Sequence, residues 1–267
     1  MPERVEEENY CKGKLFIIGG GKRPPELLQN LIRISNVDSS GYIIVLPMSS
    51  SIPDTASFYG KKQFKDQGIN KVYSFNFQTS EDMTDARIDS LTNASLIYIS
   101  GGDQNRFMEI IANTPVYEAI HQAFLNGSVI AGTSAGAAVM SKKMITGNEH
   151  KYPEYTGNFR TIEANNIEIG EGLGLLENAI IDQHFVWRMR MNRLITATLE
   201  NPQETGIGID ESTAILVEGD TAKVYGKYQV IVIRHKSAET KIINGLLGAK
   251  NMELSVYLAG DQFQINE

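Results

Sequence analysis

The feature that most constrains the fold is a repeated order of short apolar segments and helix-like segments along the first two-thirds of the chain. The apolar segments have the length of β-strands and lie at residues 14–20, 42–48, 71–77, 94–102 and 128–134. Segments with a helical spacing of apolar residues separate them. Short strands that alternate with helices are typical of a parallel sheet covered on both faces. We therefore predict an α/β fold, a three-layer sandwich with a mostly parallel central sheet.

The C-terminal part of the chain has a different sequence pattern. After Thr205 the sequence is rich in strand-like segments, which we expect to add antiparallel strands to the far side of the same domain. No linker separates the two parts, so residues 14–267 are predicted to form a single α/β hydrolytic domain after a polar N-terminal tail, residues 1–13. Residues 143–170 are polar and aperiodic, and we predict a loop or lid there.

Composition narrows the possible partners and the compartment. The net charge of −7 argues against nucleic acid or an anionic membrane surface as the main partner. No apolar segment approaches the roughly 20 residues needed to span a bilayer. The polar N-terminus lacks the apolar core of a signal peptide, so we expect a cytoplasmic protein or one whose export signal has been removed. With Cys11 as the single cysteine, an intrachain disulfide is excluded.

The segment Gly132-Thr133-Ser134-Ala135-Gly136 follows a predicted strand and fits the G-x-S-x-G pattern of a nucleophile elbow. Glycines on both sides leave room for a serine on a strained turn, and the N–H of Ala135 then points at the reacting carbonyl oxygen. Close packing of small residues between a helix and a sheet is the alternative explanation. A nucleophilic serine also needs a base, so a candidate base elsewhere in the sequence would favour the nucleophile over close packing.

Of the four histidines, His184 is the best candidate for that base. His121 and His150 lie in a helix-like segment and a polar loop and are expected at the surface, and His235 ends a late strand. His184 ends the apolar segment 179–185, where an extended strand would put Asp182 and His184 on one face. A structural histidine tied to a carboxylate is the alternative.

Three arginines, Arg188, Arg190 and Arg193, follow His184 closely. In a helix Arg190 and Arg193 would be neighbours, whereas Arg188 would project elsewhere. Such a run is usually a solvated basic face. Here apolar residues, among them Trp187 and Leu194, alternate with the arginines, so at least one arginine should be partly buried. Arginines beside a base suit bidentate binding of a substrate carboxylate.

The third member of a triad is a carboxylate that orients the histidine. Asp210 and Glu211 interrupt an apolar, glycine-rich strand pattern, and they point to opposite faces. The pattern alone does not choose between them. In either case the order is serine, histidine, acid, which differs from the serine, acid, histidine order of α/β-hydrolases.

Glycine turns end two of the predicted strands. The turn Gly101-Gly102-Asp103-Gln104 precedes the helices that lead to Ser134, so the N–H of Gly102 could complete an oxyanion hole with Ala135, and Gln104 could contact substrate; a plain tight turn is the alternative. The turn at residues 19–21 matches neither a P-loop nor a dinucleotide-binding fingerprint. No H-x-x-x-H or C-x-x-C pair suggests a metal site.

Taken together, these motifs resemble those of the cyanophycinase family, serine peptidases of the S51 type. The resemblance runs from about Leu15 to Val217. It rests on GGDQ (101–104), GTSAGAAVM (132–140), GEGLGLL (170–176), DQHFVWRMRMNRL (182–194) and GIGIDESTA (206–214), in this order.

The resemblance implies a class I glutamine amidotransferase-like fold and a homodimeric peptidase. We expect no metal and no cofactor. Ser134 would be the nucleophile, His184 the general base and Glu211, rather than Asp210, the orienting acid. The residues implied to line the substrate pocket are Gln104, Asp182, Gln183, Arg188, Arg190 and Arg193. The substrate would be cyanophycin, a poly-aspartate with arginine on its side chains, and the product β-aspartyl-arginine dipeptides.

Two other functions are compatible with the same motifs. One is an aspartyl dipeptidase-like S51 peptidase that acts on short peptides containing aspartate. The other is an amidotransferase-fold binding protein without catalysis, which would leave the joint presence of Ser134, His184 and Glu211 unexplained.

Overall fold

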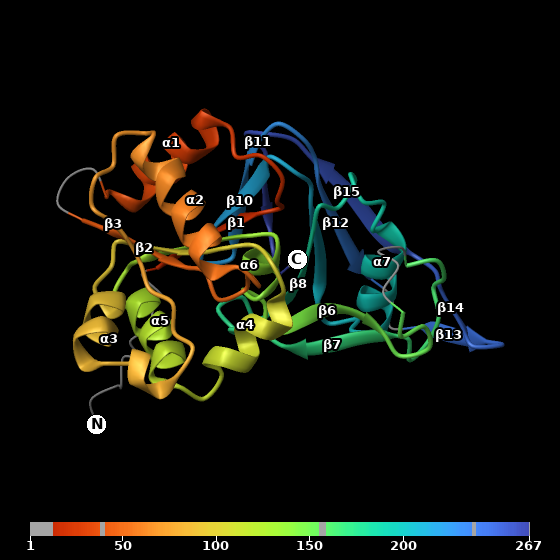
Figure 1. Cartoon of the computed structure of the whole chain (residues 1–267). Helices are drawn as coiled ribbons and strands as arrows, with labels where there is room; N and C mark the ends of the chain where they lie inside the picture. Colours follow the sequence, from red (N-terminus) through yellow and green to blue (C-terminus); the bar gives the residue numbers. More distant parts are fainter. Residues whose placement is uncertain (1–12, 38–40, 155–158, 237–238, 267) are drawn as a thin grey trace, which may run out of the picture.

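The computed structural model describes residues 13–37, 41–154, 159–236 and 239–266. The predicted N-terminal tail, except for Gly13, and Cys11 within it lie outside the described residues. Figure 1 shows a central sheet with helices on both sides and a second group of strands next to it.

The central sheet has eight strands in the order β16-β11-β10-β1-β5-β4-β2-β3. Its parallel strands are β1 (Lys14–Ile18), β2 (Ile43–Leu46), β3 (Val72–Ser74), β4 (Leu96–Ile99) and β5 (Val129–Thr133). Its antiparallel strands are β10 (Thr213–Glu218), β11 (Thr221–Gly226) and β16 (Gln262–Gln264). The five predicted N-terminal strands therefore form, although β3 is much shorter than the predicted segment 71–77.

Helices cover both faces of this sheet, which confirms the predicted layers. On one face, helices α1 (Pro25–Ser35) and α2 (Pro53–Lys65) pack on residues such as Phe16 and Val45. On the other face lie α3 (Asp85–Thr92), α4 (Gln104–Ile111) and α5 (Pro115–Leu125), which pack on residues such as Ile17 and Ile97. A 3-10 turn, η1 (Ser80–Asp82), precedes α3, and the short helix α6 (Ala135–Ala138) follows β5. Because successive residues of a strand point to opposite faces, these almost fully apolar strands supply both cores.

A second sheet has the order β15-β12-β9-β8. It contains β8 (Ala179–Gln183), β9 (Thr205–Ile209), β12 (Val230–His235) and β15 (Met252–Tyr257), of which only β8 and β9 pair in parallel. One face, with Ile181 and Ile207, joins the main core. The other, with Ile180 and Ile233, is covered by helix α7 (Met191–Glu200). The C-terminal strands are thus divided between two sheets.

The segment 143–170 is more ordered than predicted. Strands β6 (Lys143–Glu149) and β7 (Ile167–Glu171) pair antiparallel and form an arm that runs from α4 along the second sheet toward α7 (Figure 1). The prediction of a loop across 143–170 is therefore wrong at its two ends, because buried residues such as Met144, Ile145 and Ile167 anchor both strands. A second hairpin, β13 (Thr240–Ile243) and β14 (Leu246–Ala249), lies on the far side of α7.

The polar turns after β1, β4 and β5 lie at one edge of the main sheet, because carboxyl ends of parallel strands share an edge. The turns after β8 and β9 lie at the same edge and contact the turn after β1. The N–H of His184 donates to the carbonyl of Gly19 at 2.6 Å, and the N–H of Ser212 donates to that of Gly20 at 2.9 Å. Ligands of α/β folds bind at such edges. No helix in the described part of the chain is long and apolar enough to cross a membrane.

Candidate active site

A pocket of about 280 Å³ opens at this edge of the sheet. It lies where the turns after β4, β5 and β8 meet the arm of β6. The described residues that line it are Gly102, Asp103, Gln104, Asn105, Ser134, Thr146, Gly147, Asn148, Gln183, Arg188, Arg190 and Arg193.

Ser134 lies on a strained turn between β5 and α6. Its φ of 55° and ψ of −113° are uncommon for a residue with a side chain, and its N–H donates to the carbonyl of Ile18 at 3.1 Å. Side chains at the flanking glycines would collide with backbone: a Cβ at Gly132 would overlap the carbonyl of Gly136, and one at Gly136 that of Ile99. Close packing of small residues and a half-buried serine on a strained turn are thus two aspects of one structure.

His184 contacts Ser134 directly. Strand β8 ends at Gln183, and His184 adopts a φ of 49°. The predicted strand 179–185 is therefore two residues too long, and the expected sharing of one face by Asp182 and His184 is wrong. The turn directs the imidazole toward β5, where its Nε2 lies 2.9 Å from the Oγ of Ser134.

Glu211 and Asp210, which the pattern could not distinguish, make different contacts. The Oε1 of Glu211 lies 2.6 Å from the Nδ1 of His184. The Oδ1 of Asp210 instead accepts the backbone N–H of Trp187 at 2.9 Å and so fixes the segment after His184. Glu211 therefore completes a hydrogen-bonded chain of carboxylate, imidazole and hydroxyl, and Asp210 supports the loop beside it.

The surroundings favour a neutral imidazole. Burial lowers the pKa of His184, the bond to Glu211 opposes this, and the positive charges of Arg188 and Arg190 lower the pKa further, so that it lies below the usual value for histidine. A neutral imidazole bonded to a hydroxyl is the form that accepts a proton. The arrangement can thus deprotonate Ser134 for nucleophilic attack.

The glycine turn at residues 19–21 contributes to the site in a way that sequence motifs did not reveal. Gly20 and Gly21 have φ values of 116° and 66°. A Cβ at Gly20 would overlap the imidazole of His184, and one at Gly21 would approach the Oε2 of Glu211 to 2.5 Å. The turn is the surface against which histidine and acid lie. The feature of the sequence that could have assigned this turn to the site was its position at the carboxyl end of the first strand.

Two of the three arginines, Arg190 and Arg193, form a buried ion-pair cluster with Asp182, whose side chain is fully buried and does not line the pocket. The Nε of Arg193 donates to Asp182 at 2.7 Å, and its terminal nitrogen bonds the other carboxylate oxygen. Arg190 lies 3.7 Å from Asp182 and donates to the carbonyl of Gln183 at 2.7 Å. The predicted burial of at least one arginine is confirmed, for Arg190 and Arg193.

The local structure around the arginines differs from a continuous helix. Residues after His184 form turns, and α7 begins only at Met191, with Arg190 directly before it. Arg190 and Arg193 nevertheless meet at Asp182, whereas Arg188 is exposed and lines the pocket.

The turn after β4 lies beside Ser134. Gly102 has a φ of 145°, and an added Cβ would overlap the carbonyl of Ser49. A Cβ at the preceding Gly101 would lie 3.3 Å from the Cβ of Ser134. Gly102 and Ala135 are thus placed near the nucleophile position, as the oxyanion-hole prediction requires, and that role stays a prediction.

The two glutamines of the pocket make different bonds. The side-chain nitrogen of Gln104 donates to the carbonyls of Ile145 and Thr146 and so fastens β6 to α4. The Oε1 of Gln183 lies 3.4 Å from the Oγ of Ser134. Gln104 therefore positions the β6 wall of the pocket, and Gln183 is near the reacting atom.

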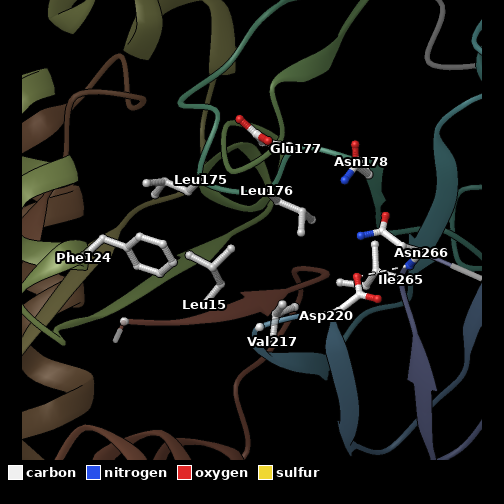
Figure 2. A pocket seen from close by; sticks show the side chains of 12 residues that line it. Leu15, Phe124, Leu175, Leu176, Glu177, Asn178, Val217, Asp220, Ile265 and Asn266 are labelled. Atoms are coloured by element: carbon white, nitrogen blue, oxygen red, sulfur yellow. Dashed lines mark hydrogen bonds between the residues drawn. The ribbon is translucent and has the colours of Figure 1, made fainter. Parts of the chain in front are cut away.

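A second pocket, of about 160 Å³, lies at the opposite end of β1 (Figure 2). Its lining is mixed: aliphatic side chains such as Leu15, Leu176 and Val217 lie next to the polar side chains of Glu177, Asn178, Asp220 and Asn266. None of the described residues that line it is a serine, cysteine or histidine. Among the described residues no group of histidine, cysteine or carboxylate side chains could hold a metal ion.

Comparison with known proteins identifies the family. The model of peptidase family S51 matches residues 15–225. Cyanophycinase of Nostoc sp. strain PCC 7120 is 32% identical over 95% of this chain and 86% of its own length. Cyanophycinase of Synechococcus elongatus is 30% identical over 99% of this chain and 83% of its own.

Solved structures share the fold. A peptidase from an acI-B1 Actinobacterium has a TM-score of 0.69 at 23% identity and covers 94% of this chain and 96% of its own. A putative peptidase E from Listeria monocytogenes EGD-e has a TM-score of 0.56 at 18% identity and covers 80% of this chain and 98% of its own. The extent of the family match and the level of identity to the curated relatives show that the chain belongs to peptidase family S51.

Proposed function

We propose that this cyanophycinase-like peptidase hydrolyses cyanophycin with Ser134, His184 and Glu211 as its catalytic triad. The observation that carries the proposal is the hydrogen-bonded chain from Glu211 through His184 to Ser134, with distances of 2.6 and 2.9 Å, beside a pocket lined by arginines. It is the arrangement that nucleophilic catalysis by serine requires.

In the proposed acylation, the Oγ of Ser134 attacks the scissile carbonyl while the Nε2 of His184 takes the hydroxyl proton. Glu211, bonded to Nδ1, holds the imidazole in orientation and stabilises the imidazolium that forms. The N–H groups of Gly102 and Ala135 would bind the developing oxyanion. His184 then protonates the leaving amine, and the C–N bond breaks to leave an acyl-enzyme.

Deacylation repeats the sequence with water. Water loses a proton to His184 and attacks the ester carbonyl, and the Oγ of Ser134 leaves with that proton. The free acid and the unmodified serine are the products of this step.

The pocket suits a substrate that carries free carboxylates. Each cyanophycin unit presents the carboxylate of its side-chain arginine, and the exposed guanidinium of Arg188 is available for a charge-assisted hydrogen bond with it. Arg190 and Gln183 line the same wall. Arg193 and Asp182 hold that wall through their buried ion pair.

The decisive experiment is incubation with purified cyanophycin and, separately, with Asp-Xaa dipeptides, followed by chromatography of the products. Release of β-aspartyl-arginine by the wild type but not by Ser134→Ala is expected. Cleavage of Asp-Xaa dipeptides alone would favour an aspartyl dipeptidase, and failure on both substrates would contradict the proposal. Homodimerisation, which the resemblance implies, is tested by sedimentation equilibrium.

A further inference from the structure

The charges around the pocket are unequally distributed. The wall formed by the turn after β8 and the first turn of α7 carries the guanidinium groups of Arg188, Arg190 and Arg193. The nearest carboxylate on that wall, Asp182, is fully buried beneath the pocket and already bonds Arg193. This wall therefore attracts a substrate carboxylate and repels a substrate guanidinium.

A second wall has the opposite charge. Asp103 lies in the turn between β4 and α4, and among the described residues that line the pocket it alone carries a carboxylate. Its side chain is exposed. A cation within the pocket would thus find its counter-charge on this wall.

The carboxylate of Asp103 is held in place by the helix that follows it. As the N-cap of α4, its Oδ1 accepts the backbone N–H groups of Asn105 at 2.8 Å and Arg106 at 3.4 Å. Both bonds go to the same oxygen, so Oδ2 can accept a further donor. The side chain is thereby preorganised for a ligand, which lowers the entropic cost of binding.

The cyanophycin unit has the same pair of charges. Its side-chain arginine carries a carboxylate and a guanidinium, so a pocket that admits the unit must accept both. If the carboxylate bonds Arg188, the guanidinium is most favourably placed away from the three arginines. A carboxylate with a free oxygen binds a guanidinium by charge-assisted hydrogen bonds.

We propose that Asp103 is a substrate-binding residue that recognises the guanidinium of the substrate's arginine. The inference rests on the proposed function and deepens it: the two walls select a unit with both charges. Discrimination against a neutral side chain of the same shape follows, because Asp103 would lose its ionic partner.

The test compares two soluble oligomers, one of β-aspartyl-arginine units and one in which citrulline replaces arginine. Citrulline keeps the carboxylate and the shape but has a neutral urea group. The variant is Asp103→Asn, because asparagine is as good an N-cap as aspartate and keeps α4 intact. The matched control is Glu109→Gln, which removes the same charge from an exposed position of the same helix outside the pocket lining.

The wild type is expected to have a KM about tenfold lower for the arginine oligomer than for the citrulline oligomer, as for loss of a hydrogen bond to a charged group. In Asp103→Asn the KM for the arginine oligomer should rise to the citrulline value, with kcat nearly unchanged. Glu109→Gln should behave as the wild type does. Unchanged thermal melting of Asp103→Asn would show that the cap is kept.

Two results would overturn the proposal in distinguishable ways. Wild-type cleavage of the arginine oligomer with an unchanged preference in Asp103→Asn would refute the role of Asp103 and leave the proposed function standing. Absence of cleavage of either oligomer by the wild type would refute the proposed function and, with it, the role of Asp103.

Discussion

The two ends of strand β1 border two different kinds of pocket. At its start, Leu15 belongs to the pocket of Figure 2, with a volume of about 160 Å³. Beyond its end, the turn of Gly20 and Gly21 supports His184 and Glu211 beside the pocket of about 280 Å³. One short strand therefore runs from a pocket lined by no described serine, cysteine or histidine to a pocket beside the hydrogen-bonded chain of Glu211, His184 and Ser134.

The difference lies in backbone strain and charge more than in size. Ser134 and His184 both have positive φ, a conformation that costs about 1–2 kcal/mol for a residue with a side chain. Such strain persists only where the surrounding structure imposes it, and it concentrates at functional sites. The end of the sheet where Ser134 and His184 adopt this conformation is the end at which we propose the catalytic site.

Removal of the nucleophile or the base would test this contrast most severely. We expect Ser134→Ala and His184→Ala each to lower kcat about 10⁴- to 10⁶-fold, because the members of the proposed triad would act as a unit. Thermal melting should change little. A serine-directed fluorophosphonate should label the wild type and not Ser134→Ala, and substantial residual turnover in Ser134→Ala would refute the mechanism.

The supporting role of the glycine turn is tested by Gly20→Ala. A Cβ there would overlap the imidazole of His184, so the ring must move. Misplacement of a catalytic group by about 1 Å costs about 100-fold in rate, and we expect kcat to fall by this order. Gly68→Ala is the control: Gly68 also has positive φ, of 89°, but a Cβ there meets nothing within 4 Å. Equal activities of the two variants would contradict the supporting role.

The buried ion pair is tested by Asp182→Asn. Loss of this carboxylate leaves the buried guanidinium of Arg193 without its counter-charge, and we expect unfolding free energy to fall by about 3–5 kcal/mol. In urea denaturation Asp66→Asn, which breaks an exposed pair with Lys62, should cost at most about 1 kcal/mol. Because Arg193 also lines the pocket, KM should rise in Asp182→Asn. A loss of unfolding free energy no larger than that of Asp66→Asn would show that the buried ion pair does not stabilise the fold.

The smallest expected effect is a shift in pH dependence. Burial, together with Arg188 and Arg190, lowers the pKa of His184. The base works when neutral, so wild-type kcat/KM should decline only below the usual range of histidine. Removal of one positive charge in Arg188→Gln raises the pKa of His184, and the acid limb of the kcat/KM profile should move to higher pH. Arg33→Gln, at an exposed position of α1, should leave the limb in place; a shift to lower pH in Arg188→Gln would contradict the assignment.

Much of the fold was predictable because it follows from local pattern. The order of apolar and helix-like segments predicts the parallel strands and the helices on both faces, since burial on both sides of a strand requires a continuous apolar run. The G-x-S-x-G pattern predicts the turn at Ser134, because only small neighbours fit there. Where pattern was weak, as in the arm of β6 and β7, the prediction failed: a few buried residues anchor those strands within a polar segment.

The sequence by itself determined the alternation of strands and helices that puts polar turns at one edge of a parallel sheet, the candidate serine and the candidate histidine. Local pattern left open which of two adjacent acids meets His184; the family resemblance implied Glu211, and the tertiary structure shows that contact. Tertiary structure alone decided that two of three arginines bond a buried aspartate and that the first glycine turn supports the imidazole of His184. The physical reason is distance along the chain. Ser134 and His184 are 50 residues apart, and His184 and Glu211 are 27 apart, so their contacts depend on the exact ends of β8 and β9 rather than on any local pattern.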